Sequence, residues 1–148
     1  MRRCLLIAAA LTVCAASLSA CATGSAGRDA ETRARYVAHA GAPVDKFRLF
    51  GQLTRWTALD DQSLVVWTRP SEAWLLDLTG PCPDLEYAYA IGLTDTLGTV
   101  NARFDKVLVS SRSPVKLPCH IAQIRPVDTK ALKADTRESR ESRQPSGT

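Results

Sequence analysis

Two short apolar segments in the middle of the chain restrict its fold more than any other feature. Residues 63–68 (SLVVWT) and 73–78 (AWLLDL) flank the polar residues 69–72 (RPSE). Pro70 suits the second position of a type I turn, so we expect a four-residue loop between two antiparallel strands. Both faces of these strands are apolar. This pattern predicts a hairpin at the centre of a sheet, not at its rim.

A four-residue loop also predicts the register of the hairpin. It places Trp67 opposite Trp74 on one face and Val66 opposite Leu75 on the other. Core packing explains most aromatic residues of a small domain, because aromatic side chains dominate the energetics of small cores. The best candidates for a binding surface are nevertheless aromatic: Trp56, Trp67, Trp74, Tyr87 and Tyr89.

Further strands are expected on both sides of the hairpin. They are predicted at 46–53, 90–94, 106–110 and 120–127. The sequence GPCPD at residues 80–84 interrupts this pattern, and residues 84–88 are expected to form one helical turn. Short strands separated by Gly and Pro turns predict a mainly β fold, a compact antiparallel sheet or a small barrel-like domain.

The first 21 residues have the features of an export signal. Arg2 and Arg3 are followed by an uncharged apolar stretch at residues 4–18. This stretch is shorter than the roughly 20 residues that a membrane-spanning helix needs, and its length and flanks match the apolar region of a signal peptide. It runs into the sequence LSAC at residues 18–21, which resembles the lipobox of bacterial lipoproteins.

The lipobox resemblance implies cleavage between Ala20 and Cys21 and attachment of a diacylglyceryl group to the Cys21 thiol. Acylation of the new amino terminus, for example with palmitate, completes the anchor, since one acyl chain alone gives only marginal membrane binding. Ala22 is not the Asp that often retains such proteins in the inner membrane. We therefore expect an outer-membrane protein whose domain faces the periplasm.

The chain is then expected to have four parts. Residues 1–20 form the signal peptide, and residues 21–43, rich in Ala, Gly, Ser and Thr, form a flexible tether after the lipidated cysteine. Residues 44–127 form the folded domain. Residues 128–148 carry nine charges and no aromatic residue, which predicts a disordered polar tail.

Two cysteines, Cys82 and Cys119, lie in the expected domain. In an oxidising periplasm such a pair predicts a disulfide, and closing a 37-residue separation contributes about 4 kcal/mol in the chain-entropy model. The alternative is a metal site completed by His120. A structural zinc site normally takes four ligands in paired short spacings, and a redox role would need a Cys-x-x-Cys motif. We expect a disulfide, no metal and no cofactor.

The charge pattern argues against nucleic acid as a partner. The formal net charge is +4, but without Arg2 and Arg3 the chain has 17 basic and 15 acidic side chains. These charges are interspersed, and no basic stripe with interleaved aromatic residues is present. The expected partners are the membrane, through the lipid anchor, and an envelope protein or cell-wall component.

No motif of a known catalytic site is present, neither G-x-S-x-G nor H-E-x-x-H nor a P-loop. We therefore expect a non-enzymatic binding or structural module. One alternative is an inhibitor of cell-wall hydrolases, which rests on fold-level analogy alone. Another is a small periplasmic hydrolase, which would need His120 in a cleft beside Asp84 or Asp105.

The order of these residues resembles an uncharacterised family of small Gram-negative envelope lipoproteins, a domain of unknown function. The resemblance covers residues 44–127 and is most specific at the two cysteines in their apolar settings. It implies no established activity and no catalytic residue. Its elements are Trp56, the LVVWT strand, Trp74, Cys82-x-x-Leu85-x-x-Ala88-x-x-Ile91, Asp105 and Cys119-x-Ile121-x-x-Ile124-x-Pro126.

Overall fold

A computed structural model describes residues 24–114 and 116–143 of the chain. The predicted signal peptide, its cleavage site and the lipidated Cys21 lie outside these residues. The elements follow in the order α2 (Gly24–Ala38), β1 (Lys46–Arg48), β2 (Arg55–Ala58), β3 (Ser63–Arg69), β4 (Glu72–Leu78), the 3₁₀ turn η2 (Leu85–Tyr87), β5 (Ala90–Leu93), β6 (Thr99–Asn101), β7 (Lys106–Ser110), β8 (Cys119–Val127) and α3 (Thr129–Arg143).

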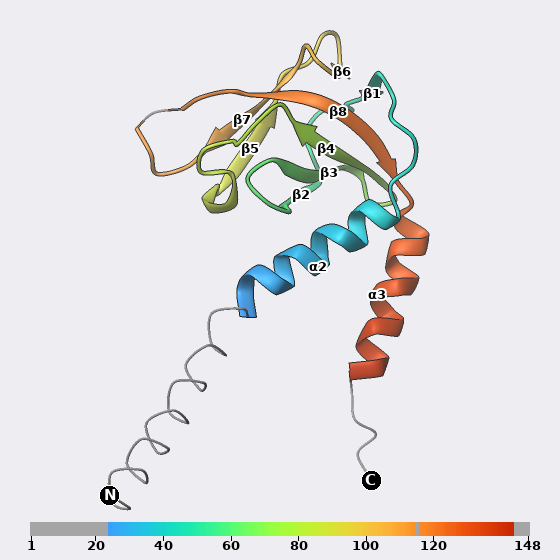
Figure 1. The fold of residues 1–148 in the computed structure, drawn as a ribbon. Helices are drawn as coiled ribbons and strands as arrows, with labels where there is room; N and C mark the ends of the chain where they lie inside the picture. The colour runs from blue at the N-terminus through green and yellow to red at the C-terminus, as the bar shows by residue number, and fades with distance from the viewer. Residues whose placement is uncertain (1–23, 115, 144–148) are drawn as a thin grey trace, which may run out of the picture.

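Six of these strands form one antiparallel sheet in the order β2-β3-β4-β8-β7-β5, and β1 pairs with β6 in a separate ladder. The nine-residue β8 pairs with β4 along most of its length and with β7 at its start. It bends between the two halves, so the sheet curls into a nearly barrel-shaped layer (Figure 1). This arrangement confirms the predicted mainly β class and the predicted helical turn.

The central hairpin is confirmed, but its predicted register is wrong by one residue. Arg69 pairs with Glu72, so the loop has two residues, and Thr68 is the extra residue of a bulge beyond it. Trp67 consequently lies opposite Ala73, not opposite Trp74. Because side chains alternate along a strand, this one-residue shift turns Trp67 to the other face of the sheet.

The two faces of the sheet carry two separate hydrophobic cores. The first lies on the inner face, where Phe47 of β1, Val100 of β6 and Leu85 of η2 cover it. The second lies on the outer face, beneath α2 and α3. β1, which is shorter than the predicted 46–53, pairs with β6 over the inner face, and β2 is an edge strand of the six-stranded sheet. These strands have only three or four residues, too few for a local pattern to reveal.

The predicted flexible tether is wrong for residues 24–38, which form α2. Tyr36 and Val37 pack against the outer core, and the Tyr36 ring meets the Trp67 ring edge-on at 6.1 Å. Burial raises the pKa of the Tyr36 hydroxyl, although Arg55 and Arg35 partly offset this. A few apolar contacts with the sheet therefore order a segment whose own sequence is weakly helical.

The predicted disordered tail is likewise wrong for residues 129–143, which form α3. The Asp128 carboxylate accepts hydrogen bonds from the backbone N–H groups of Lys130 and Ala131, at 3.0 and 2.9 Å, and so caps the helix. Leu132 is buried in the outer core. An N-cap and one apolar anchor thus start a helix that composition alone did not predict.

A polar contact links the two helices. His39, just after α2, places its Nε2 atom 3.1 Å from Oδ2 of Asp135 in α3, and Arg35 lies 3.6 Å from the same oxygen. The hydrogen bond to His39 and the charge of Arg35 lower the pKa of the Asp135 carboxyl, against a smaller opposing effect of burial.

Among the described residues, no helix is both long enough and apolar enough to span a bilayer.

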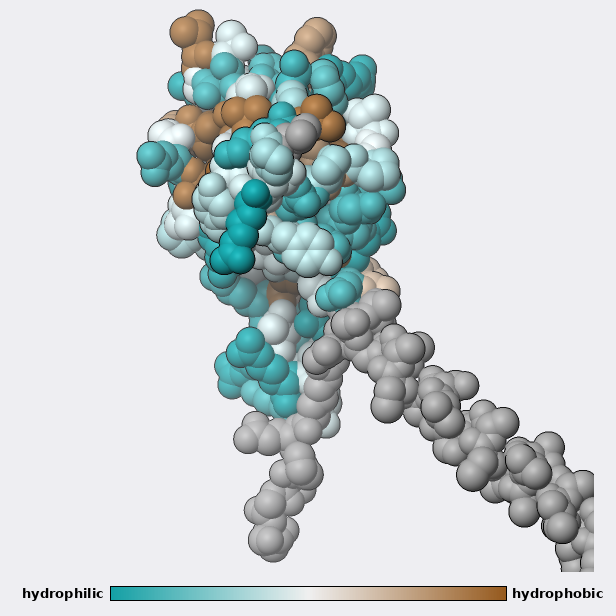
Figure 2. All heavy atoms as spheres, turned by 90° about the vertical axis from the view of Figure 1, so that its left-hand side faces the viewer, coloured by the Kyte–Doolittle hydropathy of each residue, from teal (hydrophilic) through white to brown (hydrophobic). Residues whose placement is uncertain are grey.

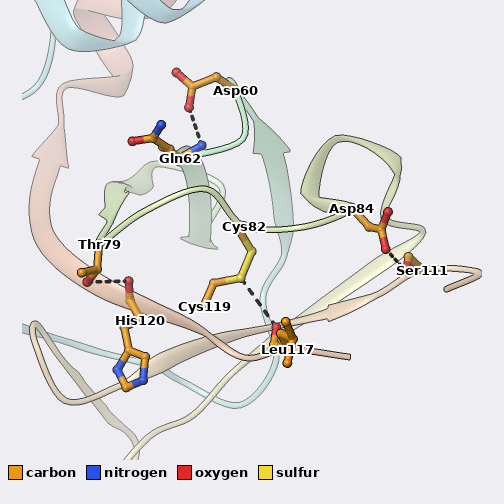
Figure 3. The surroundings of a disulfide bond; sticks show 9 residues. All are labelled: Asp60, Gln62, Thr79, Cys82, Asp84, Ser111, Leu117, Cys119 and His120. Atoms are coloured by element: carbon orange, nitrogen blue, oxygen red, sulfur yellow. Dashed lines mark hydrogen bonds between the residues drawn. A yellow bond between two sulfur atoms is a disulfide. The ribbon is translucent and has the colours of Figure 1, made fainter. Parts of the chain in front are cut away.

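The predicted disulfide between Cys82 and Cys119 is confirmed (Figure 3). The two Cα atoms are 5.6 Å apart, and both cysteines are buried in the inner core. The bond joins the segment after β4 to the first residue of β8. Beside it, the Cys82 N–H donates to the Asp61 carbonyl at 2.7 Å. The bond therefore holds the irregular segment before η2 against the sheet.

Candidate functional site

A groove lies where the barrel-like sheet fails to close. Within the described residues, β2 and β5 each pair with one strand only, β3 and β7 respectively, so they are the two edges of the six-stranded sheet. A groove of about 700 Å³ is lined by both edges and by residues 49–54, which precede β2. We call it the edge groove.

The backbone of β2 leaves hydrogen-bonding groups free along its edge. The Leu59 N–H donates to the Ser63 carbonyl at 2.9 Å, at the end of the β2–β3 ladder. Because bonded and non-bonded pairs alternate in an antiparallel ladder, the backbone groups of Trp56 and Ala58 point away from β3.

The same alternation holds on β5. The Thr94 N–H donates to the Lys106 carbonyl at 3.0 Å, so the backbone groups of Ile91 and Leu93 point away from β7. Trp56, Ile91 and Leu93 all line the edge groove. The groove is therefore bordered by free strand edges on two sides, which is the geometry that an added strand requires.

The edge groove is lined by apolar and polar side chains in similar measure. Leu49, Leu53, Trp56, Ile91 and Leu93 are half-buried and pack against the inner core. The polar residues of the groove are Gln52, Thr54, Tyr89 and Asp95. Arg55 also lines it, but its guanidinium group lies over the Trp67 ring on the outer face of the sheet. This mixed composition suits an extended segment with both apolar and polar side chains, whose backbone can pair with a strand edge.

Exposed aromatic and aliphatic side chains extend from one end of the groove. Tyr89 is 70% exposed and Tyr87 is 81% exposed. Leu108 of β7, which pairs with Gly92 of β5, is also exposed. Figure 2, which views the side carrying β5 and β7, shows apolar patches set among hydrophilic residues. Tyr89 is thus the best-placed exposed ring to touch anything bound in the groove.

The three tryptophans proposed as a binding surface do not form one surface. Trp56 lines the edge groove. Trp74 shares the inner face with Trp56 but stacks on Phe47, with ring centroids 5.0 Å apart. Trp67 is 3% exposed in the outer core, where the Arg55 guanidinium lies 3.9 Å from its ring centroid. Only Trp56 belongs to the candidate site.

The groups suggested for a hydrolase lie apart. His120 is exposed, and its imidazole points away from the disulfide and from Asp84 (Figure 3). The Asp84 carboxylate accepts a hydrogen bond from the Ser111 hydroxyl at 3.1 Å. Asp105 is buried on the side of the sheet opposite to His120, beside Ile121. Among the described residues, no three His, Cys, Asp or Glu side chains are grouped to hold a metal ion.

The buried Asp105 carboxylate holds the end of β5, which borders the edge groove, and the end of β6. Its carboxylate accepts hydrogen bonds from the Thr94 hydroxyl at 2.7 Å, and from the Asn101 N–H and side-chain amide at 2.7 and 3.0 Å. Burial by itself raises the pKa of Asp105, but these hydrogen bonds outweigh it and lower the pKa below its ordinary value. The Thr94 oxygen also accepts from the Lys106 N–H, which holds the end of β5 to β7.

The edge groove could not be predicted from the sequence, because β2 and β5 meet there only through the tertiary fold. Residues 49–53 and 90–93 were visible only as members of predicted strands, and β2 was not predicted at all. The pairing of strand edges far apart in sequence has no local signal. The one signal was aromatic residue type, which named Trp56 and Tyr89 together with three aromatic residues that do not line the groove.

The fold and the groove define a small, disulfide-bonded β-domain with an incompletely closed barrel-like sheet. The chain belongs to the Family of unknown function (DUF6491), whose model matches residues 1–143. No curated protein and no solved structure matches the chain significantly.

Proposed function

We propose that this chain is a lipid-anchored protein of the bacterial envelope that binds an extended segment of another envelope protein in the edge groove. Acyl chains on Cys21 hold it in the outer membrane, and the β-domain faces the periplasm. It acts as a binding module, without catalysing a reaction.

The observation that carries the binding role is the pair of free strand edges that border one groove. An extended peptide added to a free edge gains main-chain hydrogen bonds, and its alternate side chains enter apolar pockets. Leu53, Trp56 and Ile91 supply such apolar walls. A strand in this position also covers edges that otherwise invite unspecific pairing.

The anchoring role is supported by the sequence of the leader. The LSAC sequence at residues 18–21 follows an apolar stretch of signal-peptide length. A disulfide in the domain agrees with an oxidising compartment. α2 begins at Gly24, so only two residues separate an anchor on Cys21 from the helix that leads to the sheet.

Photocrosslinking in the native envelope tests the binding role. A photoreactive amino acid replaces Tyr89 in the full-length chain, which is expressed in its bacterium and irradiated. We expect a discrete adduct with one envelope protein. A second copy of the experiment places the probe at Phe104, which is 79% exposed and does not line the edge groove; it should give no such adduct.

Ala90→Arg sharpens this test, because Ala90 lines the groove with an exposed small side chain and the change adds bulk there. Ala134→Arg on the exposed face of α3 is the matched control. The Tyr89 adduct should disappear with Ala90→Arg and persist with Ala134→Arg. An adduct that survives both changes, or none with the probe at Tyr89, would exclude the edge groove as the binding site.

A further inference from the structure

A second groove, of about 510 Å³, has a different chemistry. It lies between the β1–β6 ladder and the turn end of the β3–β4 hairpin. Three cations and one carboxylate surround an aromatic floor. We call it the basic groove, and its residues are Lys46, Phe47, Arg48, Phe50, Arg69, Glu72, Trp74 and Thr99.

Two of the cations in the basic groove, Arg48 and Arg69, lie over the ring of Phe50. Its ring is 50% exposed, and the guanidinium groups of Arg69 and Arg48 lie 4.1 and 5.8 Å from the ring centroid. Stacking on an aromatic face restricts a guanidinium group and leaves its N–H edge free for a planar anion. Arg69 also contacts Glu72 at 3.8 Å, where the Arg69 side chain is exposed and the Glu72 side chain is half-buried.

The floor of the basic groove is aromatic. Trp74 is half-buried and stacks on Phe47 with an interplanar angle of 15°. Phe50 and Trp74 therefore present ring surface to the same groove. Flat apolar surface beside charged donors suits a ligand that combines a saturated ring with anionic groups, because the ring packs on the aromatic faces while the anions meet the cations.

The groove also lies far from the expected anchor. The start of α2, which an anchor on Cys21 would hold near the membrane, and the β1–β6 ladder are at opposite ends of the molecule (Figure 1). In the proposed orientation, the basic groove faces away from the outer membrane and into the periplasm.

We propose that the basic groove binds peptidoglycan, through the carboxylates of its stem peptides and the faces of its sugar rings. Arg48 and Arg69 pair with carboxylates, Lys46 adds a third cation, and Phe50 and Trp74 contact the glycan. The inference rests on the envelope location in the proposed function, and it is independent of the edge groove. A protein that uses both grooves connects an envelope protein to the cell wall.

The test is a titration of the full mature chain in detergent with a purified disaccharide–tetrapeptide fragment of peptidoglycan, followed by calorimetry. The double variant R48Q/R69Q removes two exposed cations of the groove. The matched control, R103Q/R140Q, removes two exposed arginines elsewhere. We expect affinity to fall about tenfold or more in R48Q/R69Q, as loss of charged hydrogen bonds predicts, and to stay unchanged in the control.

F50L keeps the charges but removes the aromatic face, and it should also weaken binding. Equal affinity in R48Q/R69Q and R103Q/R140Q, or no heat at millimolar fragment, would overturn the proposal. Binding to vesicles with anionic phospholipid but not to the fragment would overturn it in favour of a lipid headgroup. Ala90→Arg should leave fragment binding intact, so failure here and failure of the edge-groove proposal are distinguishable.

Discussion

Trp67 and Trp74 lie on opposite faces of one hairpin, only because Thr68 forms a bulge between Trp67 and Arg69. If Thr68 paired regularly with Ala73, Trp67 would lie opposite Trp74 and the two rings would share a face. The bulge instead gives each core one tryptophan: Trp67 anchors the helices on the outside, and Trp74 packs against Phe47 on the inside. The bulge at Thr68 therefore places Trp67 on the outer face, where it packs against Tyr36 of α2.

Trp67→Ala should therefore destabilise the domain strongly. Trp67 is buried between the outer core, Tyr36 and the Arg55 guanidinium, and removal of such a ring typically costs about 3–5 kcal/mol. Urea unfolding followed by circular dichroism measures the change. Phe104→Ala, at an exposed position, should alter stability by less than about 0.5 kcal/mol. Similar small effects in both variants would contradict the assignment of Trp67 to the outer core.

The double variant C82S/C119S should lose about 4 kcal/mol of stability, since the bond closes a 37-residue separation. The segment between β4 and η2 should loosen first, because only a few backbone hydrogen bonds hold it otherwise. Hydrogen exchange at the Cys82 and Leu85 positions reports this loosening. Stability that is indifferent to reductant in the unmutated chain would argue against the bond.

Asp105 should make the stability of the domain depend on pH in the acid range. Its folded pKa lies below the ordinary value of 3.8, so its contribution to stability is complete above that value and is lost as the pH falls through the folded pKa. Asp105→Asn should therefore be less stable than the unmutated chain at pH 7, by about 1–3 kcal/mol. The difference should shrink in unfolding measurements below pH 3.8. A difference that stays constant down to pH 2 would rule out the carboxylate as its source.

Asp135→Asn should loosen the connection between the helices, because it removes the charge that meets His39 and Arg35. Backbone hydrogen exchange in α2 and α3 should become faster, while exchange in β3 and β4 stays slow. Glu141→Gln is the control on the same helix, since its partner Arg137 is exposed and lies within α3 itself. Equal acceleration in both variants would mean that the His39 contact does not hold the helices together.

Cys21→Ala should abolish membrane attachment if acyl chains on Cys21 are the anchor. In fractionated cells, the unmutated chain should sediment with membranes, and its intact mass should exceed that of the polypeptide from residue 21 by the acyl groups. The variant should lack the acyl mass and appear in the soluble fraction. An unmodified Cys21 in membrane-extracted protein would refute lipid anchoring.

Much of the fold follows from local patterns. The hairpin, the strands near residues 90, 106 and 120, the helical turn and the Cys82–Cys119 bond were all predicted, because each depends on alternation, on turn residues or on a cysteine count. The two helices were not predicted. Tyr36 and Leu132 are among the few large apolar residues of polar segments. They stabilise the helices only because the outer face of the sheet lies beneath them, which the sequence does not show.

The sequence by itself determined a mainly β domain with one disulfide, since periodicity and residue type act over a few positions. The tertiary structure alone decided the bulge at Thr68, the separation of the tryptophans and the two grooves. Trp56 and Ile91 border one groove because the sheet curls through β8, and Arg69 reaches Phe50 because the segment of β1 lies against the hairpin turn. Such neighbours are set by strand order and packing, which depend on the whole chain at once.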